Sequence, residues 1–275
     1  MIRNVLSIAG SDPSGGAGIQ ADLKTFAARG VYGMAAVTAL TAQNTQGVWG
    51  VHLVPSQFVA DEISAVFADI RVDAVKIGMI ADAAIAVAVA DVMQSHSNIP
   101  VVLDPVMIAK GGAALLDPDA VQTLIGRLLP LATLLTPNLP EAAALLHEPV
   151  AETRQEMAEQ AIRLRGLGPA NVLIKGGHLG GDTSPDILAT EQGLTWFEGQ
   201  RAATANTHGT GCTLSSALAA ELAKGATMQQ AMAAAKAYLA KSIALADTLD
   251  VGSGHGPVQH FHGVWQGLAA QGCSK

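Results

Sequence analysis

The segment Asn206-Thr-His-Gly-Thr-Gly-Cys212 combines a glycine-rich turn with a nucleophilic side chain. A long apolar stretch follows it and predicts a helix, so the turn would form the N-terminus of that helix. Backbone N–H groups at such a terminus have no partner inside the helix, and together with the helix dipole they attract anions. The turn is therefore a candidate site for a phosphate group or for an oxyanion that develops during a reaction.

Cys212 is the first side chain after this turn. A thiol at a helix N-terminus has a lowered pKa, because the positive end of the dipole stabilises the thiolate. We therefore predict that Cys212 is a reactive thiolate. The alternative is a small buried side chain that only fills the core. The sequence contains neither a Walker A motif nor a G-x-S-x-G motif, which excludes those two routes to catalysis.

A second glycine-rich segment runs from Gly10 to Asp22. Its residues 16–21 fit a loose dinucleotide-binding fingerprint, but five residues separate them from the preceding strand, and no acidic residue follows the second predicted strand. We predict a substrate-binding loop instead, whose glycines let the backbone approach a flat ligand and whose Asp12 or Asp22 supplies a polar contact. An ordinary strand-to-helix loop is the alternative.

Three further residues suit the binding of a phosphate and its metal ion. Asn138 and Glu141 stand at a predicted helix start and offer the hard oxygen ligands that Mg²⁺ prefers. A helix cap with its partner three residues on explains the same Asn-x-x-Glu spacing equally well. Lys175 follows a buried strand and could serve as a point charge for phosphate, or it could be a surface lysine whose stem covers apolar neighbours.

Short apolar runs alternate with longer amphipathic segments along most of the chain. This alternation is typical of a parallel sheet with helices on both faces. Right-handed crossovers then place the strand C-termini, where glycines and polar residues gather, along one ligand-binding edge. Strands are expected at Val5–Ala9, Ala35–Leu40, Ala74–Gly78, Val101–Asp104, Leu134–Thr136 and Val172–Lys175, with a hairpin of Asp186–Thr190 and Leu194–Glu198. Helices are expected near Gly18–Arg29, Ser56–Asp69, Ala83–Ser95, Pro118–Leu128, Glu141–Leu146 and Glu152–Leu167, then from Gly211 through Leu222 and from Met228 to Leu249.

The composition fits one α/β domain over residues 1–275, with a loose tail from about residue 265. Hydrophobic residues make up 49% of the 275 residues, which supplies enough apolar material for a large core and excludes disorder. The net charge of −7 argues against nucleic acid as a partner. The sequence has no signal peptide and no apolar run long enough to span a membrane, so we expect a cytoplasmic protein.

The C-terminal region contains three histidines and one of the two cysteines. His255, His260 and His262 lack acidic or cysteine partners nearby in the sequence, so we expect surface residues and assign no structural metal. Cys273 is expected to be free in a frayed terminus.

Several segments, taken in order, resemble the hydroxymethylpyrimidine/phosphomethylpyrimidine kinases of thiamine biosynthesis, which belong to the ribokinase-like superfamily. The resemblance runs nearly end to end, and its combination of motifs is more specific than any one of them. The segments that carry it are Ala9–Asp22, Ala42-Gln-Asn-Thr45, Lys76-Ile-Gly-Met79, Leu103-Asp-Pro-Val-Met107, Thr136-Pro-Asn-Leu-Pro-Glu141, Lys175-Gly-Gly-His178 and Asn206–Cys212.

The resemblance implies an ATP- and Mg²⁺-dependent kinase with a three-layer α/β/α fold, no separate lid domain and a homodimeric assembly. Its small-molecule substrate would be 4-amino-5-hydroxymethyl-2-methylpyrimidine, converted to the monophosphate and then to the diphosphate in one site. The resemblance places the pyrimidine among Gly10, Ala17, Asp22, Gln43, Met79, Val106 and Cys212. It places the nucleotide phosphates and Mg²⁺ among Asp104, Asn138, Glu141, Lys175, Thr207, Gly209, Thr210 and Gly211.

One position departs from the wider superfamily. Sugar kinases carry an aspartate as general base after the glycine turn, and this chain has Cys212 there. We hypothesise that the Cys212 thiolate assists deprotonation of the hydroxymethyl group in the first step, while the second acceptor, already an anion, needs no base. The nearest alternative is a pyridoxine/pyridoxal kinase on the same scaffold. More distant ones are a cysteine hydrolase using His208 or His178 and a non-catalytic ligand-binding regulator.

Overall fold

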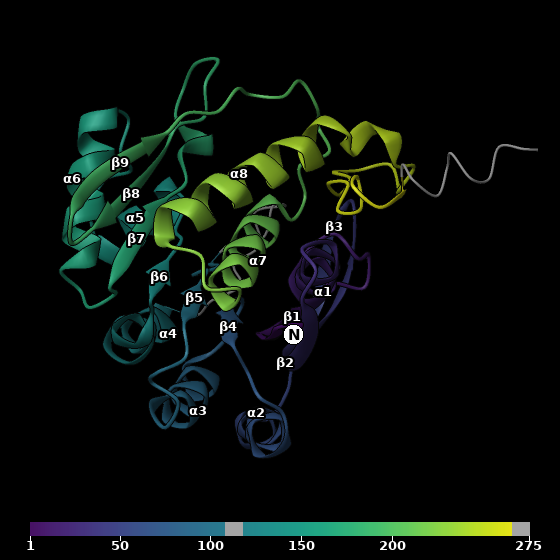
Figure 1. Ribbon diagram of the computed structural model, residues 1–275, viewed down its shortest axis with the longest axis vertical. Helices are drawn as coiled ribbons and strands as arrows, with labels where there is room; N and C mark the ends of the chain where they lie inside the picture. Colours follow the sequence, from purple (N-terminus) through teal and green to yellow (C-terminus); the bar gives the residue numbers. More distant parts are fainter. Residues whose placement is uncertain (108–117, 266–275) are drawn as a thin grey trace, which may run out of the picture.

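A nine-stranded sheet forms the centre of the computed structural model, which describes residues 1–107 and 118–265 (Figure 1). The strand order is β3-β2-β1-β4-β5-β6-β7-β8-β9. The bounds of the strands are β1 Asn4–Ser11, β2 Tyr32–Asn44, β3 Gly47–Leu53, β4 Ala74–Ile77, β5 Val101–Leu103, β6 Leu134–Leu135, β7 Asn171–Ile174, β8 Asp186–Thr190 and β9 Gly193–Phe197.

The six central strands, in the order β2, β1, β4, β5, β6 and β7, run parallel to one another. Strand β3 adds antiparallel to β2 at one edge, and the hairpin β8–β9 adds antiparallel to β7 at the other. The prediction of a mostly parallel sheet with an appended hairpin is therefore confirmed.

Two helical layers cover the sheet (Figure 1). Alternate strand residues point to opposite faces, so that Val5 and Leu6 of β1 belong to different core clusters. On one face the sheet packs against α1, α7 and α8, and on the other against α2 to α6. The bounds of the helices are α1 Gly18–Ala28, α2 Ser56–Asp69, α3 Ala83–Gln94, α4 Pro118–Thr123, α5 Leu139–Leu146, α6 Arg154–Arg165, α7 Thr210–Ala223 and α8 Met228–Ala244.

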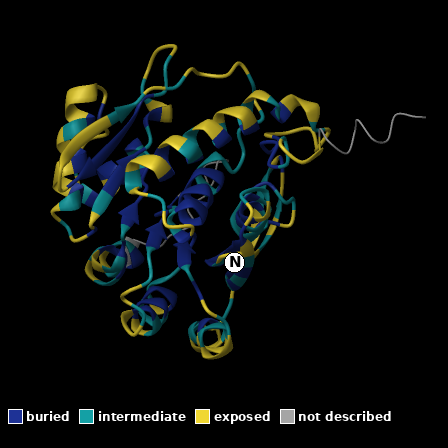
Figure 2. Ribbon diagram, viewed as in Figure 1, coloured by how far each residue is buried: buried dark blue, intermediate teal, exposed yellow. Residues whose placement is uncertain are grey.

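Helix α7 is buried around most of its circumference, whereas the outer helices expose one face (Figure 2). It lies against the sheet and α8 packs over it, which explains why small and apolar side chains surround the helix instead of forming one apolar stripe. Its buried position fixes its N-terminal turn rigidly at the edge of the sheet. Among the described residues, no helix combines the length and the apolar composition that crossing a bilayer requires.

The structure differs from the predicted elements mainly at β2 and β3. Strand β2 continues to Asn44, past the predicted end at Leu40, and turns into β3, which was not predicted. Most of β3 is solvent-exposed, so it lacks the alternation of buried and exposed residues by which strands are recognised. The predicted helix from 118 to 128 is α4 followed by a π-helical turn, Leu124–Leu128.

Candidate active site

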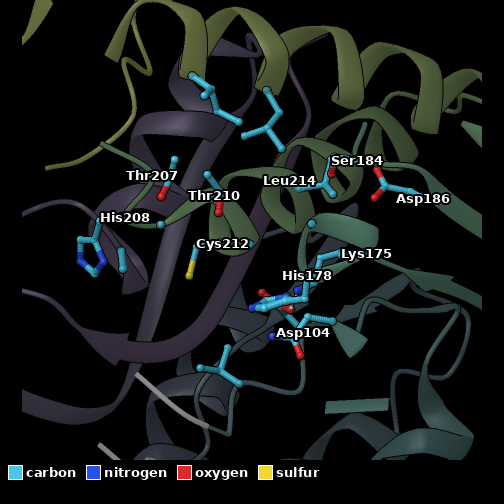
Figure 3. Close-up of a pocket in the computed structure, with 18 of the residues that line it drawn as sticks. Asp104, Lys175, His178, Ser184, Asp186, Thr207, His208, Thr210, Cys212 and Leu214 are labelled. Carbon is cyan, nitrogen blue, oxygen red and sulfur yellow. Dashed lines mark hydrogen bonds and ion pairs between the residues drawn. The ribbon is translucent and has the colours of Figure 1, made fainter. Parts of the chain in front are cut away.

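A cavity of about 1470 Å³ opens where the parallel strands end. This is the edge at which open α/β sheets bind ligands, and the cavity walls come from strand ends and from the start of α7 (Figure 3). All but one of the predicted site residues line it. They are Gly10, Asp12, Ala17, Gln43, Met79, Asp104, Val106, Asn138, Glu141, Lys175, Thr207, Gly209, Thr210, Gly211 and Cys212.

The two glycine-rich segments pack directly against each other in one wall of this cavity. Gly209 has a φ of +77°, and a Cβ atom there would lie 1.8 Å from the carbonyl oxygen of Gly16. Only glycine therefore fits at this contact. Helix α7 begins at Thr210, and in the described part of the chain no side chain caps its first turn. The Gly209–Gly211 turn thus presents backbone amides and the positive helix end to the cavity.

Lys175 lies opposite this turn and forms a buried charge cluster. Its Nζ is 2.7 Å from Asp104 Oδ1 and 3.8 Å from Glu141 Oε2. A Cβ atom on Gly211 would lie 3.3 Å from the same Nζ, so the lysine reaches the turn. Burial lowers the pKa of Lys175, but the neighbouring carboxylates of Asp104 and Glu141 outweigh this and raise it above its usual value. The lysine is therefore a fixed positive charge beside the candidate phosphate site.

Glu141 takes part both in a helix cap and in the charge cluster. The Asn138 side chain accepts from Glu141 N–H at 2.8 Å, and Glu141 Oε2 accepts from Asn138 N–H at 2.8 Å. The capping-box interpretation is thus confirmed, yet the same carboxylate faces Lys175. Burial raises the pKa of Glu141 to about 7, with Lys175 opposing the rise and Asp104 adding to it.

The carboxylates of Asp104 and Glu141 fit the predicted role in holding Mg²⁺. Both are hard oxygen ligands and both are buried, and burial together with the Asp104 carboxylate raises the pKa of Glu141, so a bound cation would favour its ionised form. No group of three or more His, Cys, Asp or Glu suitable for a metal occurs within residues 1–107 and 118–265. Two carboxylates completed by water and phosphate oxygens are what Mg²⁺ commonly accepts.

Cys212 lines the cavity at the start of α7, but the prediction that it is a thiolate is wrong. Burial raises the pKa of the thiol to about 11, and although Lys76 lowers it, the carboxylate of Asp22 adds to the rise. The desolvation of the thiol therefore outweighs the effect of the nearby ammonium. Cys212 is a protonated thiol at neutral pH, not a thiolate.

The cavity floor contains a buried ion pair that changes the interpretation of Asp22. Both Asp22 oxygens lie 2.8–2.9 Å from Lys76 Nζ, and each also accepts a hydroxyl, from Ser7 or Ser216, at 2.6 Å. Asp22 is fully buried and absent from the cavity lining, whereas Lys76 lines it. The prediction that Asp22 contacts the substrate is therefore not supported: it holds Lys76 in place. Sequence reasoning missed Lys76 as a site residue, although a lysine within the apolar run 74–77 was a signal.

Asp12 lines the cavity but is occupied by its own loop. One carboxylate oxygen accepts from the N–H and hydroxyl of Ser14, and the other from the N–H groups of Gly16 and Ala17 and from His208 Nε2 at 2.8 Å. Burial raises its pKa, but the hydrogen bonds from His208 and Ser14 outweigh this and lower it to about 2. Asp12 thus shapes the glycine loop and ties it to His208, in place of its predicted contact with substrate.

The cavity has two ends on either side of Cys212. The glycine-loop end is lined mostly by small and apolar groups, namely Gly10, Ala17, Met79 and Val106, together with Gln43. A Cβ atom on Gly10 would lie 2.8 Å from Met79 Cε, so the backbone and Met79 approach each other closely here. The hairpin end extends beyond Lys175 between β8–β9 and α8. It was not predicted, and its lining includes Ser184, Asp186, Trp196, Glu198, Lys236 and Ala240.

Two of the three C-terminal histidines differ from their predicted surface positions, since His260 is buried and His262 is half-buried. His260 is buried, and its Nε2 lies 3.1 Å from Thr213 Oγ1 of α7. Burial lowers its pKa to about 4, so it is neutral. Residues 256–260 are buried and hydrogen-bonded to distant parts of the chain, which the sequence does not reveal, and this makes His260 a core residue. His255 is exposed as expected, and Cys273 lies outside the described residues.

The family model described as phosphomethylpyrimidine kinase matches residues 12–259. The chain belongs to the phosphomethylpyrimidine kinase family. The matched region contains nearly every predicted site residue, including the whole of the charge cluster and the Gly209–Gly211 turn.

The similarity of this family member to known proteins extends over nearly the whole chain. It is 54% identical to the hydroxymethylpyrimidine/phosphomethylpyrimidine kinase of Escherichia coli over 262 residues, 95% of this chain and 98% of that protein. A crystal structure of phosphomethylpyrimidine kinase from Clostridium difficile is 42% identical, with a TM-score of 0.78 and coverage of 88% and 99%. An ADP complex of Bacillus subtilis pyridoxal kinase is 36% identical, with a TM-score of 0.86 and coverage of 94% and 98%.

Membership of this kinase family removes the hydrolase and regulator interpretations. The geometry agrees, because His208 Nε2 is bonded to Asp12 and Cys212 is protonated, which is not the state of a cysteine-hydrolase pair. In Figure 3, Cys212 lies between His208 and the Lys175–Asp104 pair.

Proposed function

We propose that this protein transfers the γ-phosphoryl group of ATP to 4-amino-5-hydroxymethyl-2-methylpyrimidine and then phosphorylates the monophosphate again, in thiamine biosynthesis. The observation that supports this best is the convergence of Lys175, the Gly209–Gly211 amides and Cys212 at the centre of one cavity. The cavity volume of about 1470 Å³ exceeds the roughly 300–1,000 Å³ of a usual ligand pocket and suits two substrates side by side.

The two ends of the cavity fit the two substrates. We assign the pyrimidine to the glycine-loop end, where Gly10, Ala17 and Met79 offer small and apolar contacts to a ring and Gln43 offers both a donor and an acceptor. We assign the nucleotide to the hairpin end, with Thr207 and Asn138 near its phosphates. The acceptor hydroxymethyl group then meets the γ-phosphoryl group beside Cys212.

The catalytic work in this arrangement is the neutralisation of charge and the positioning of the reacting atoms. Phosphoryl transfer passes through a loose transition state whose charge lies on the equatorial phosphate oxygens. The Gly209–Gly211 amides and the Lys175 ammonium hold those oxygens, and Asp104 and Glu141 are placed to hold Mg²⁺. When bound, Mg²⁺ supplies further positive charge to the phosphates.

Cys212 has a different role from the one its sequence context predicts. As a protonated thiol it contacts the acceptor without taking its proton. A loose transition state develops little bond to the attacking oxygen, so deprotonation can follow transfer rather than precede it. In the second step the acceptor is a phosphate anion and needs no base, so both steps fit one site.

A spectrophotometric assay coupled to ADP release tests this proposal, with purified protein, Mg²⁺ and ATP. The kcat/KM for the pyrimidine alcohol is compared with that for pyridoxine. A higher value for the pyrimidine supports the assignment, and a higher value for pyridoxine contradicts it.

The second candidate is a pyridoxal kinase activity in the same cavity. The similarity to the Bacillus subtilis enzyme favours it, as does Cys212, whose sulfur could add to an aldehyde ligand. Pyridoxal lacks the amino group next to a ring nitrogen that Gln43 can recognise in the pyrimidine, so we expect it to be the poorer substrate.

A homodimer is the assembly that the surface supports. The edge strand β3 and its neighbour β2 expose Trp49 (64%), Val51, Tyr32 and Leu40, and an exposed apolar sheet edge is a pairing surface. Light scattering after gel filtration should give twice the mass of the chain. Trp49→Glu should yield the monomer, whereas Ile162→Glu, at an exposed apolar position on α6, should leave the dimer intact.

A further inference from the structure

The Nε2 atom of His208 lies within hydrogen-bonding distance of two side chains, Asp12 and Gln43. Asp12 Oδ2 lies 2.8 Å away, and the Gln43 side-chain amide, with its Nε2 position nearest, lies 3.3 Å away. An ionised carboxylate only accepts hydrogen bonds, so Nε2 carries a hydrogen and donates it to Asp12. The atom of Gln43 that faces this N–H must then be an acceptor, which is the carbonyl oxygen and not the NH₂ group.

The other end of the Gln43 amide leads to the same conclusion independently. Thr41 Oγ1 lies 2.8 Å from the carbonyl oxygen of Ser11, which can only accept, so the single hydroxyl hydrogen of Thr41 is used there. The end of the Gln43 amide that lies 3.3 Å from Thr41 Oγ1 must therefore donate. That end is the NH₂ group.

Both conditions are met by one orientation of the amide. The oxygen and nitrogen of a side-chain amide occupy equivalent positions, so their partners decide which way it points. With the carbonyl toward His208 and the NH₂ toward Thr41, each contact pairs a donor with an acceptor: the Nε2–H of His208 is shared between Asp12 and the Gln43 carbonyl, and one amide hydrogen is donated to Thr41 Oγ1. With the reverse orientation, N–H faces NH₂ at one end and a hydroxyl lacking a spare hydrogen faces an oxygen at the other.

We propose that His208, held by Asp12, is a positioning residue that fixes the Gln43 amide with its carbonyl toward His208 and its NH₂ toward Thr41. Neither sequence reasoning nor the family match assigns His208 this role. Gln43 lines the cavity, so this orientation determines on which side the amide offers its second N–H and on which side its second carbonyl lone pair.

This orientation has a consequence for substrate choice, which rests on the proposed function. An amide presents a donor and an acceptor side by side, and this pair is complementary to a ring nitrogen next to an amino group, as when Gln reads adenine. The aminopyrimidine has that pattern and pyridoxine does not. A fixed amide therefore favours the pyrimidine and is the basis of discrimination against pyridoxine.

Two variants of His208 test the proposal by the ratio of kcat/KM for the two substrates. In His208→Gln, the side-chain N–H can occupy the place of Nε2, so the preference for pyrimidine should be retained. His208→Met has a similar volume but no donor. We expect KM for the pyrimidine to rise about tenfold with a smaller change in kcat, so that the ratio of kcat/KM for pyrimidine over pyridoxine falls about tenfold. Equal preference in both variants overturns the proposal. Absence of phosphorylation in the unmodified protein contradicts the proposed function instead.

A second measurement does not depend on activity or on mutation. In ¹⁵N-edited NOE spectra, the Gln43 side-chain NH₂ protons should show a stronger cross-peak to the Thr41 methyl group than to the His208 ring protons. The reverse intensity order overturns the proposal.

Variants of Thr41 give a further test by activity. Thr41→Ser, which keeps the acceptor, should keep the pyrimidine preference, and Thr41→Val should reduce it.

Discussion

Lys175 Nζ lies 2.7 Å from Asp104 Oδ1, and the buried carboxylate and the half-buried lysine lie beside the Gly209–Gly211 turn. The ion pair holds the lysine in position and charged before any nucleotide arrives. It leaves Glu141, 3.8 Å from the same Nζ, as a second carboxylate facing one ammonium. The site therefore has an excess of negative charge that Mg²⁺ bound to a nucleotide can balance.

Replacing Lys175 by Gln should lower kcat by about 10²–10³-fold, because the transition-state charge loses a preorganised donor. Steady-state kinetics at saturating substrates measure this loss. Lys241→Gln, which removes an exposed lysine from α8, is the matched control and should leave kcat unchanged. A Lys175→Gln kcat within tenfold of the unmodified value contradicts the assigned role.

Glu141 should make stability depend on pH in a direction set by its raised pKa. Its pKa is about 7 in the folded protein against 4.5 ordinarily, so the folded state binds more protons between these values. The stability that this proton contributes is present below pH 4.5 and is lost as the pH rises through 7. Urea unfolding from about pH 5 to about pH 8 should show the protein losing about 1–3 kcal/mol relative to Glu141→Gln.

The Glu141→Gln variant supplies the comparison because its neutral amide resembles the protonated carboxyl group. Titrating groups that do not interact with Glu141 contribute equally to both proteins and cancel in the difference. A difference that stays constant or grows in favour of the unmodified protein contradicts the raised pKa.

Cys212 should react slowly with iodoacetamide at neutral pH, because only the thiolate is nucleophilic and burial raises the pKa of the thiol to about 11. Mass spectrometry of the peptide that contains Cys212 follows the reaction across pH. The second cysteine is removed from the measurement by using a Cys273→Ser background.

The same state of Cys212 predicts that Cys212→Ser keeps kcat for the first phosphorylation within about tenfold, since a hydroxyl replaces a neutral thiol. Loss of the first step alone, with the second step intact, would instead establish Cys212 as the base for the hydroxymethyl group.

The buried pair of Lys76 and Asp22 should contribute strongly to stability. Asp22→Asn leaves the Lys76 ammonium buried without its counter-ion and should lower the free energy of unfolding by about 3–5 kcal/mol. The double variant Lys76→Met/Asp22→Leu should recover much of this loss, because apolar replacement removes both buried charges. Urea denaturation measures the unmodified protein, Asp22→Asn and the double variant, and a double variant no more stable than Asp22→Asn contradicts the pairing.

Much of the fold follows from patterns within the sequence. The parallel strands and the β8–β9 hairpin were predictable because buried strands form short apolar runs with clear turns between them. Strand β3 was not, since its residues face solvent and its place is set by pairing with β2. His260 shows the same limit: its burial depends on a C-terminal segment packing against α7, a contact between distant parts of the chain.

The site was predicted in its composition but not in the partners of each group. Residues near strand ends converge because the topology brings those ends together, so the lining could be foreseen. The protonation of Cys212 and the pairing of Asp22 with Lys76 depend on three-dimensional burial, which spacing does not encode. The hydrogen bonds that Asp12 accepts within its own loop likewise depend on the folded conformation of that loop.

The most direct test of the central claim is to count the phosphates added to each pyrimidine. Protein, Mg²⁺, excess ATP and 4-amino-5-hydroxymethyl-2-methylpyrimidine are incubated, and products are resolved over time by mass spectrometry. We predict that the monophosphate appears first and then declines as the diphosphate accumulates, with two ADP released per pyrimidine. Failure to phosphorylate the pyrimidine, or accumulation of the monophosphate with no diphosphate, contradicts the account.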